Sequence, residues 1–407
     1  MIHLTQAEKR SDMNDMRSTA RRLFDAGVQA ADPVAAVTRH LDDLPAPALI
    51  VAVGKAARGM AHAALSRFAG VPAIVVTNYE NAQPLDGAAV FAAGHPVPDE
   101  SGAKAALAVI AALRAAQGPV LALISGGGSA LLPAPAGALT LADKIAVNRL
   151  LLASGLDIRA MNLIRQQLSD IKGGGFLRHA APNNVTALIL SDVVGDDLSA
   201  IASGPTAPPI GTAAQAVTML RDANLWDRVP PSVRDHLAQA RPAPDLPAAR
   251  NILIGSNRQS VAAMAQAAGV AHVIAAPVTG DVADAAKLIC DQARPGITLW
   301  GGETTVMLQG TGRGGRNQEL ALRIAIVAAD RGWGDWTCLQ AGSDGRDGPT
   351  DAAGGIVDQD SLGKIAGLAA LLANNDSYAA LAQVDGLLLT GATGTNVADL
   401  GVLIRRG

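Results

Sequence analysis

Short hydrophobic runs that end in small polar residues recur along the chain. Each run is rich in Val, Ile and Leu, ends in Gly, Ser, Thr, Asn or Asp, and precedes a helical segment. The runs lie at 48–55, 73–78, 120–129, 185–192, 251–257, 272–281, 297–304, 336–345 and 386–395. Because they are almost continuously apolar, they predict strands of parallel sheets that are covered on both faces. Strands alternating with helices predict an α/β fold.

The segments between the runs have helical spacing. Segment 316–331 places four apolar residues on one helical face, namely Leu320, Ile324, Val327 and Ala328. Segment 101–117 predicts a helix with its N-cap near Ser101, ending at Gly118. Ligands of α/β sheets bind at the carboxyl ends of the strands, so we expect the functional residues in the turns that follow the runs.

Proline-rich stretches interrupt this alternation at 203–211 and 241–247. A new hydrophobic run begins directly after the second stretch, so we expect two domains, at 1–247 and 248–407. The length of 407 residues supports at least two domains. A content of 49% hydrophobic and 17% charged residues is typical of a packed globular protein.

Composition also excludes several classes of function. A formal net charge of −3 gives no broad basic surface, so no nucleic-acid partner is expected. The cysteines, Cys290 and Cys338, lie outside any zinc-binding spacing. Segment 115–142 carries no formal charge, but its prolines and its SGGGS core argue against a membrane helix. The polar N-terminal stretch is not typical of a signal peptide, so we expect a cytoplasmic protein with no membrane partner.

The run LISGGGSALLPAPAG ends a strand in three glycines flanked by serines. It lacks the GK[ST] ending of a P-loop, which occurs nowhere in the chain. Glycines permit a close backbone approach, so this strand-end loop is predicted to receive an anion. The donors would be the hydroxyls and amides of Ser125, Gly126, Gly127, Gly128 and Ser129.

Two lysines and an aspartate occupy comparable positions. Lys55 follows the first hydrophobic run and a glycine; it either meets an anion or is a solvated residue at a helix start. Lys172 precedes Gly173 and Gly174 in QLSDIKGGGF, as a second anion loop or an ordinary turn. Asp192 ends another run, where a carboxylate can bind magnesium or remove a hydroxyl proton.

A literal GxGxxG occurs at Gly310, Gly312 and Gly315, between an expected strand and an expected helix. One interpretation is a dinucleotide fingerprint for NAD. The second is an anion site formed by the loop amides, the helix N-terminus and the guanidinium of Arg316. The third is a surface arginine near a turn.

Acidic residues gather in QAGSDGRDGPTDAAGG, where Asp344, Asp347 and Asp351 follow an expected strand. They form either an acidic turn or a loop that binds metal and nucleotide. Glu303 ends the preceding strand, and GATGTNVADL supplies another loop suited to a hydroxyl or a phosphate. His95, in AGHPVPDE, is interpreted as a hydrogen-bonded loop histidine. Together these groups fit phosphoryl transfer, which chiefly requires charge positioned around the moving phosphate.

Eight motifs resemble, in order, those of the class II glycerate kinases: GKAARGM, GHPVPDE, SGGGSALL, LSDIKGG, LSDVVGDDLSAIASGPT, GGRNQELAL, GSDGRDGPTDAAGG and GTNVADL. The resemblance covers nearly the whole chain. It implies an N-terminal Rossmann-like domain, with a mostly parallel sheet and helices on both faces, and a smaller C-terminal α/β domain of the MOFRL type. It also implies ATP-dependent phosphorylation of D-glycerate to 2-phosphoglycerate with a divalent metal such as Mg²⁺.

The resemblance assigns catalytic roles to Lys55, Asp192 and Arg316. We expect Asp192 to position or deprotonate the attacking hydroxyl, and the two cations to neutralise the transferred phosphoryl group, in a cleft between the domains. The expected metal ligands are Asp344 and Glu303. Contacts with substrate or nucleotide are expected from Ser125, Gly126, Gly127, Gly128, Ser129, Arg165, Lys172, Gly173, Gly174, Glu303, Gly314, Gly315, Asn317, Asp344, Asp351, Thr395 and Asn396.

One position departs from the family pattern. Gly175 stands where the family often has a basic residue, so a contact is either lost or supplied by Arg178. Two other functions stay open: a hydroxypyruvate reductase using NAD(P)H, as many relatives in tartrate pathways are labelled, and a non-catalytic sugar-phosphate-binding module. The sequence leaves open the 2- or 3-hydroxyl as acceptor, the exact metal ligands, which glycine loop holds glycerate, and the oligomeric state, with a homodimer as one candidate.

Overall fold

The computed structural model describes residues 6–239 and 246–406, with side chains described from residue 15 onward. These residues form two compact units. The central unit is Pro33–Ile254, and the terminal unit combines the residues up to Asp32 with those from Gly255 onward. This division differs from the expected boundary at 247.

The difference from the expected boundary has two physical causes. Helix α1 (Gln6–Ala30) buries Leu23 and Phe24 in the core of the terminal unit, so the N-terminal segment does not belong to the unit that follows it. Strand β6 (Ala249–Gly255) extends the sheet of the central unit, so the chain leaves that unit after this strand rather than before it.

A six-stranded sheet forms the centre of the central unit, in the order β3-β2-β1-β4-β5-β6. The first five strands are β1 (Leu49–Val53), β2 (Ala73–Asn78), β3 (Ala88–Ala93), β4 (Val120–Ser125) and β5 (Val185–Leu190). All pairs among these five are parallel. Every residue of β1 and β4 is buried, which confirms the predicted parallel sheet covered on both faces.

The register of this sheet aligns three strand ends. Val53 of β1 pairs with Ile124 of β4, and Ser125 of β4 pairs with Leu190 of β5. The residues that follow β1, β4 and β5 therefore emerge side by side at the carboxyl edge, where ligands of parallel sheets bind.

The helices of the central unit cover the sheet and add a helical subcluster. They are α2 (Pro33–Leu41), α3 (Ala57–Arg67), η1 (Tyr79–Asn81), α4 (Glu100–Ala115), α5 (Gly128–Leu131), α6 (Leu141–Leu152), α7 (Ile158–Gln167), α8 (Gly175–Ala180), η2 (Ile201–Ser203), α9 (Ala213–Asp222) and α10 (Pro231–Ala238). Helices α6, α7, α9 and α10 share a core of their own that includes Leu151, Ile164 and Leu220. This core positions the polar faces of α6 and α7.

The expected cap of α4 was wrong by two residues. The helix begins at Glu100, and the side chain of Asp99, not Ser101, accepts a hydrogen bond from the amide of Gly102 at 2.9 Å. Aspartate satisfies the free amides of the first turn and also carries the negative charge that a helix N-terminus favours.

A seven-stranded sheet forms the centre of the terminal unit, in the order β12-β11-β10-β13-β9-β7, with β8 also paired to β9. Its strands are β7 (His272–Val273), β8 (Val278–Asp281), β9 (Gly296–Thr305), β10 (Trp336–Gly342), β11 (Gly354–Asp358), β12 (Leu387–Leu388) and β13 (Asp399–Arg405). Pairing is parallel for β7 and β8 with β9, and antiparallel for β9-β13, β13-β10, β10-β11 and β11-β12.

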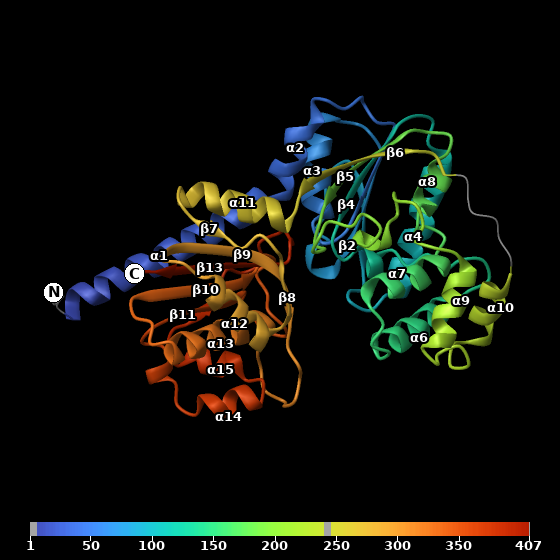
Figure 1. The fold of residues 1–407 in the computed structure, drawn as a ribbon. Coiled ribbons are helices and arrows are strands. Elements are labelled where there is room, and N and C mark those ends of the chain that lie inside the picture. The colour runs from blue at the N-terminus through green and yellow to red at the C-terminus, as the bar shows by residue number, and fades with distance from the viewer. Residues whose placement is uncertain (1–5, 240–245, 407) are drawn as a thin grey trace. The chain divides into compact units, whose positions relative to one another are not determined.

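The prediction of a parallel sheet was therefore wrong for the greater part of this unit. The physical reason is that helices cover both faces of the mixed sheet. In Figure 1, α1 and α11 (Asn257–Ala268) lie along one face, and α12 (Val282–Gln292) and α13 (Arg316–Asp330) along the other. A strand sequence that is apolar throughout indicates that both faces of the sheet are covered, but it does not indicate whether the strand pairs in parallel or antiparallel.

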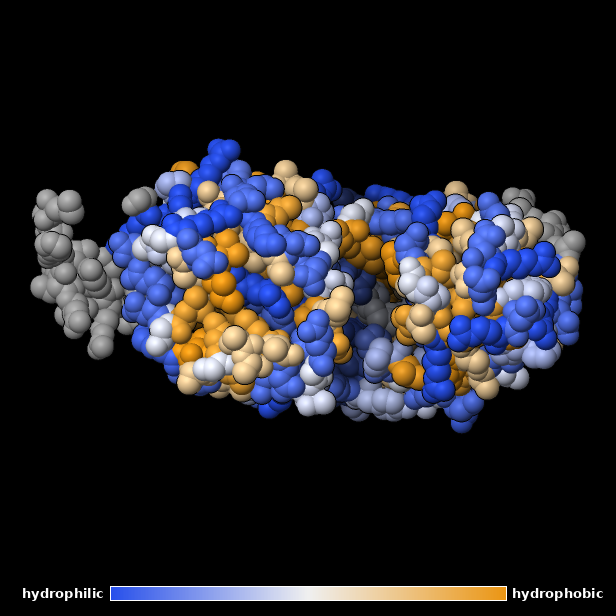
Figure 2. All heavy atoms as spheres, turned by 60° about the horizontal axis from the view of Figure 1, so that its bottom comes forward, coloured by the Kyte–Doolittle hydropathy of each residue, from blue (hydrophilic) through white to orange (hydrophobic). Residues whose placement is uncertain are grey.

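The remaining helices of the terminal unit are η3 (Leu362–Lys364), α14 (Leu368–Ala373) and α15 (Ser377–Ala382). The helix expected at 316–331 is α13; on its predicted face Leu320, Ile324 and Ala328 are fully buried and Val327 is half-buried. Hydrophobic and hydrophilic residues are mixed over the face seen in Figure 2. No helix in the described part of the chain is long and apolar enough to cross a membrane.

Candidate active site

The turns after β1 and β4 pack directly on each other. The amide of Lys55 donates to the carbonyl of Gly126 at 2.8 Å, and the amide of Ala56 donates to Oγ of Ser125 at 3.1 Å. Gly54 has a φ of +126°, and a Cβ there would overlap Ser125. The glycine before the lysine is thus required by the fold, and it places Lys55 beside the SGGGS loop.

The SGGGS loop meets a carboxylate that belongs to the protein. Gly126 leaves the room that the carboxylate of Asp192 occupies, since a Cβ on Gly126 would overlap it. Gly127, at φ +83°, donates its amide to the Asp192 carboxylate. Ser129 shares a hydrogen bond of 2.7 Å with Ser203. Three predicted site segments, the turns at Lys55, Ser125–Ser129 and Asp192, therefore come together at one edge of the sheet.

Asp192 is half-buried at this edge. Burial raises the pKa of its carboxyl group, while its own amide, the charge of Lys55 and the amide of Gly127 act in the opposite direction. A carboxylate with a raised pKa is a better proton acceptor than a solvated aspartate. This position therefore suits removal of a proton from a bound hydroxyl.

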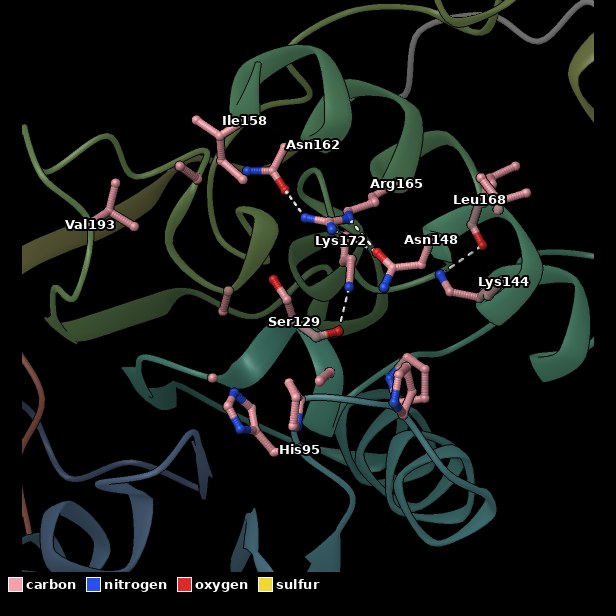
Figure 3. A pocket seen from close by; sticks show the side chains of 18 of the residues that line it. His95, Ser129, Lys144, Asn148, Ile158, Asn162, Arg165, Leu168, Lys172 and Val193 are labelled. Atoms are coloured by element: carbon pink, nitrogen blue, oxygen red, sulfur yellow. Dashed lines mark hydrogen bonds between the residues drawn. The ribbon is translucent and has the colours of Figure 1, made fainter. Parts of the chain in front are cut away.

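A cavity of about 290 Å³ opens from this edge of the sheet. Its lining includes Gly127, Ser129 and Asp192 from the strand-end turns, His95 from the turn after β3, and residues of α6 and α7. Figure 3 shows Lys144, Asn148, Arg165 and Lys172 gathered on one side of the cavity and His95 on the other.

The cations of the cavity are held by neutral oxygens. Lys172 Nζ donates to the carbonyl of Ser129 at 2.6 Å, and Lys144 Nζ donates to the carbonyl of Leu168 at 3.0 Å. Arg165 donates from Nε and Nη2 to Oδ1 of Asn148, at 3.0 and 2.6 Å. These bonds orient the three charges without neutralising them.

The glycines after Lys172 serve the backbone of the loop. The amides of Gly173 and Gly174 donate to the carbonyls of Ser203 and Gly204, at 3.2 and 2.9 Å. Their positive φ angles, +54° and +81°, suit glycine. In the predicted second anion loop, these two amides are therefore hydrogen-bonded within the protein and are not available to an anion. The loop contributes the ammonium group of Lys172 to the cavity.

The position of Arg178 bears on the departure at Gly175. Arg178 pairs with the carboxylate of Asp170 and does not belong to the lining of the cavity that holds Lys172 and Asp192. A Cβ on Gly175 would overlap the carbonyl of Asp170. Arg178 therefore does not stand in for a basic residue in this cavity.

The second group of predicted residues lies in the terminal unit, around Arg316. Its guanidinium pairs with Glu303 at 3.2 Å and with both carboxylate oxygens of Asp399, at 2.7 and 3.0 Å. Burial lowers the pKa of Arg316, but the hydrogen bond and charge of Asp399 outweigh it and raise the pKa overall. Asn317 also donates to Asp399, from Nδ2 at 3.0 Å.

A carboxylate of the chain occupies the N-terminus of α13. Asp347 accepts from the amides of Asn317 at 3.1 Å and Gln318 at 2.8 Å. Gly315 makes this possible, because a Cβ there would overlap the Asp347 carboxylate. Burial raises the pKa of Asp347 to about 6 against the opposing effect of the two amides. The N-terminus of a helix attracts an anion, and at α13 this anion is the carboxylate of Asp347 rather than a ligand.

The GxGxxG loop is likewise anchored to its own unit. The amides of Gln309 and Gly310 donate to Oδ1 of Asn375, and the amide of Thr311 donates to Oδ1 of Asn374. The amide of Gly312 donates to the carbonyl of Asn374 at 2.8 Å. These bonds occupy the amides that a dinucleotide fingerprint would turn toward a pyrophosphate, which is a structural argument against the NAD interpretation.

The remaining predicted residues are dispersed in the terminal unit. Asp351 is exposed and pairs with Arg313 at 2.9 Å. Gly314 lies against the turn at Gly348. The hydroxyl of Thr395 donates to the carbonyl of Ala31 at 2.6 Å, which ties the GTNVADL turn to the end of α1.

Asn396 and Asp344 lie in the turns that flank the Arg316 group. Asn396 accepts from the amide of Ala398 at 3.2 Å, within its own turn. Asp344 accepts from the amide of Arg346 at 3.0 Å, and its charge contributes to the raised pKa of Asp399. Asp344 therefore lies within electrostatic reach of the Arg316 group.

A divalent metal would find incomplete protein coordination here. Among the described residues, no three His, Cys, Asp or Glu side chains are grouped to hold a metal ion. Mg²⁺ in phosphoryl-transfer enzymes is commonly held by one or two carboxylates together with the phosphates of the nucleotide. Glu303 and Asp344 are compatible with that kind of coordination, because both lie near Arg316 and Asp399 at strand ends.

Several residues of these groups were not predicted as site residues. Lys144, Asn148 and Asn162 come from α6 and α7. They reach the cavity through the packing of these helices, which no local sequence motif predicts. His95 and Asp399, by contrast, lie in the motifs GHPVPDE and GTNVADL. Their position inside these two motifs is the sequence signal that could have identified them as site residues.

The comparisons with known proteins cover both units. Residues 19–238 match a family model described as a domain of unknown function, DUF4147, and residues 296–399 match the MOFRL family. A relative from Pyrococcus horikoshii, named glycerate 2-kinase, is 37% identical and aligns over 96% of this chain and 97% of its own length. A relative from Agrobacterium vitis, 39% identical over 99% of this chain and 98% of its own length, is provisionally named hydroxypyruvate reductase.

A solved structure extends the likeness to three dimensions. The crystal structure of glycerate kinase from Thermotoga maritima is 35% identical, with a TM-score of 0.87, over 96% of this chain and all of that one. The DUF4147 match alone spans more than half of the chain. The chain, which combines the DUF4147 and MOFRL domains, therefore belongs to the glycerate kinase family, and it is a kinase.

Proposed function

We propose that this enzyme transfers the γ-phosphoryl group of ATP to the 2-hydroxyl of D-glycerate, giving 2-phosphoglycerate. One observation carries the proposal: the Asp192 carboxylate, with its raised pKa, lines the same cavity as Lys144, Arg165 and Lys172. A hydroxy acid needs these two elements together, a proton acceptor for its hydroxyl and positive charge for its carboxylate.

Asp192 is the proposed catalytic base. Gly127 and Lys55 orient and stabilise its carboxylate, so the oxygen that accepts the hydroxyl proton has a defined position. Lys55 lies next to the SGGGS loop and is proposed to neutralise charge on the transferred phosphoryl group. Ser129 and the residues Gly126 to Gly128 shape the wall along which the substrate lies.

Arg316 is the proposed contact for the nucleotide phosphates. Its guanidinium is planar, permanently charged and held in one orientation by Asp399. Asn317, Gly314, Gly315, Thr395, Asn396 and Asp351 form its surroundings in the terminal unit and are kept as candidate nucleotide contacts. When bound with the nucleotide, Mg²⁺ would neutralise phosphate charge, and Glu303 and Asp344 are the carboxylates proposed to hold it.

The principal test is an assay with two parallel reactions. Purified enzyme with D-glycerate, ATP and Mg²⁺ should release ADP, and ³¹P NMR of the product should show 2-phosphoglycerate rather than the 3-isomer. Hydroxypyruvate with NADH should give no oxidation. ADP release without a requirement for added Mg²⁺, after chelation, would remove the metal from the proposal. Activity in the second reaction alone would reverse the choice in favour of the reductase, and activity in neither would favour a binding module.

A matched pair of variants tests the role of Lys55. Lys55→Ala should lower kcat by two or more orders of magnitude with little change in thermal stability. Lys104→Ala removes an exposed lysine on α4 of the same unit and should leave kcat unchanged. Near-normal turnover in Lys55→Ala would contradict its proposed role.

We further propose a cytoplasmic location, because ATP is plentiful there. Light scattering of the purified enzyme would decide between a monomer and a homodimer.

A further inference from the structure

The cavity at the carboxyl edge of the central sheet carries unbalanced positive charge. Lys144, Arg165 and Lys172 all line it, and Lys172 is 6% exposed. Within the described side chains, no ion pair joins any of these three to a carboxylate; their partners are carbonyl and amide oxygens. Buried charge without a counter-charge is costly, so proteins keep such clusters where a ligand supplies the opposite charge.

The acid within the cavity does not balance this cluster. Asp192 carries the one carboxylate among the described residues that line the cavity, and its stabilising partners are Lys55 and the amide of Gly127. One guanidinium and two lysines therefore face the cavity together with a single carboxylate, which already interacts with Lys55 and Gly127. The deficit is of the size that a carboxylate, or a carboxylate with a phosphate, would fill.

We propose that Lys144, Arg165 and Lys172 form an anion subsite for the carboxylate of a 2-hydroxycarboxylate, and that binding of this anion is coupled to proton uptake by the two lysines of the subsite. The identity of the anion as the acceptor's carboxylate rests on the proposed function. The subsite itself rests on the charges and the cavity.

The neighbours of Arg165 support a subsite that is oriented in advance. Asn148 accepts from Nε and Nη2, and Asn162 lies within hydrogen-bonding range of Nη1 at 3.4 Å. Amide oxygens hold the guanidinium in place while leaving its charge for a ligand. A carboxylate partner would have served the same orientation and cancelled the charge.

The position of the subsite defines a specificity. A carboxylate held by the three cations lies in the same cavity as Asp192, so the hydroxyl next to that carboxylate is the one presented to the base. A polyol such as glycerol has the hydroxyls but lacks the anchor. The cations of the subsite thereby select a hydroxy acid rather than an uncharged sugar alcohol.

The protonation of Lys172 follows from its surroundings. Burial, reinforced by the charge of Arg165, lowers the pKa of Lys172 to about 7. Burial, reinforced by the charges of Lys172 and Arg165, also lowers the pKa of Lys144 well below its usual value. The other charged or titratable groups facing the cavity are Lys144, Asp192 and His95. Lys172 also lines a second cavity, whose charged or titratable groups are Asp170, Arg178 and His236. An anion bound against the ammonium raises its pKa, so a fraction of the enzyme molecules must take up a proton when the anion binds at pH 8. Affinity should then fall as the pH rises above about 7.

The test is calorimetric titration of the full-length protein with D-glycerate, alone and with a non-hydrolysable ATP analogue. Titrations at pH 8 in two buffers of different ionisation enthalpy measure the protons taken up. We expect wild-type enzyme to take up a substantial fraction of one proton and glycerol to show no binding. Lys172→Met should weaken glycerate binding by roughly ten- to a hundredfold and reduce the proton uptake.

Two further variants separate charge from packing. Lys172→Arg keeps a charge that cannot be lost, so it should restore affinity and leave only the proton uptake of Lys144. Lys144→Met should raise KM more than it lowers kcat. Lys104→Met, at an exposed position of the same unit, is the matched control and should behave as wild type. Thermal denaturation of each variant establishes that it is folded.

The outcomes distinguish the subsite from the kinase reaction. Equal binding of glycerol and glycerate, or wild-type affinity in Lys172→Met, would each overturn the subsite. Unchanged proton uptake in both Lys172→Arg and Lys144→Met would overturn the coupling of anion binding to proton uptake. Glycerate binding with proton uptake, in an enzyme that releases no ADP, would instead leave the subsite standing and refute the proposed function.

Discussion

Asp399 holds Arg316 through both of its carboxylate oxygens, with Nε donating to Oδ2 at 2.7 Å and Nη2 donating to Oδ1 at 3.0 Å. The Asp399 side chain is 3% exposed, and that of Arg316 is 34% exposed. Burial raises the pKa of Asp399 even with the guanidinium beside it. The arginine is thus both a candidate contact for phosphate and the counter-charge of a buried acid.

This dual position predicts two separable losses in Arg316→Ala. Turnover should fall by orders of magnitude, because the phosphate contact is removed. Stability should also fall, by about 3 kcal/mol, because Asp399 is left buried without its counter-charge. Steady-state kinetics and urea denaturation measure the two effects.

The double variant Arg316→Ala/Asp399→Asn separates them. Removing the orphaned charge should recover most of the lost stability and none of the turnover. Recovery of activity in the double variant would show that Arg316 acts only as the partner of Asp399.

Asp192→Asn should lower kcat by roughly a hundredfold or more, because the amide cannot accept the hydroxyl proton. The folded state raises the pKa of Asp192, so the charged form of this side chain opposes folding above the usual aspartate range. The variant should therefore be as stable as wild type at pH 7, or slightly more stable. The acid limb of the wild-type kcat profile should lie above pH 3.8.

A nearby aspartate provides the control for that variant. Asp196 has a φ of +57°, a conformation that asparagine adopts readily, so Asp196→Asn should retain both activity and stability. A kcat in Asp192→Asn close to that of Asp196→Asn would contradict the role of Asp192 as the base.

Gly126→Ala tests the close approach of the SGGGS loop to the base. The added methyl group would overlap the Asp192 carboxylate and displace it, so kcat should fall by roughly tenfold or more. Gly363→Ala, where a Cβ meets no atom within 4 Å, is the matched control. Turnover in Gly126→Ala equal to that of the control would show that the exact position of Asp192 is unimportant.

Asp347 predicts a pH dependence of stability. Its pKa is about 6 in the folded state, against an ordinary value of 3.8 for an aspartate in an unfolded chain, so the folded state binds the proton more tightly. The stabilising contribution of this group is therefore present at low pH and is lost as the pH rises from about 4 to about 6, by about 1 to 3 kcal/mol. Asp347→Asn should lack this component.

Thermal denaturation of wild type and Asp347→Asn between pH 4 and pH 7 checks the sign. The stability of wild type relative to the variant should decrease across this interval. A constant difference would mean that Asp347 titrates in its usual range despite its burial.

The predictability of the fold depended on how strongly each strand is covered. The run at 73–78 coincides with β2, and those at 120–129 and 185–192 contain β4 and β5. Strand β3, with the sequence AAVFAA, was missed because four of its six residues are alanine and most of the strand is only half-buried at the edge of the sheet. Strand direction in the terminal unit could not be read from hydrophobicity, because helices cover both faces of that mixed sheet as well.

The site residues also differ in how far the sequence could predict their position. Lys55, Ser125 and Asp192 could be placed together, because parallel strands deliver the turns that follow them to one edge. Lys144, Asn148 and Asn162 could not, because they reach the cavity through the packing of α6 and α7 on α9 and α10. The glycine pattern at 310–315 suggested a dinucleotide site for a third reason. The sequence could not show that its loop amides donate hydrogen bonds to Asn374 and Asn375, which are distant in sequence.

The terminal unit is discontinuous in sequence, and this has a consequence for synthesis on the ribosome. Helix α1 packs against α11, β10 and β13, and more than two hundred residues of the central unit are translated before any of them exists. The apolar face of α1, with Leu23 and Phe24, must stay exposed or be shielded by a chaperone during that interval. The central unit is continuous in sequence, so its core can form before the elements that pack against α1 have been synthesised.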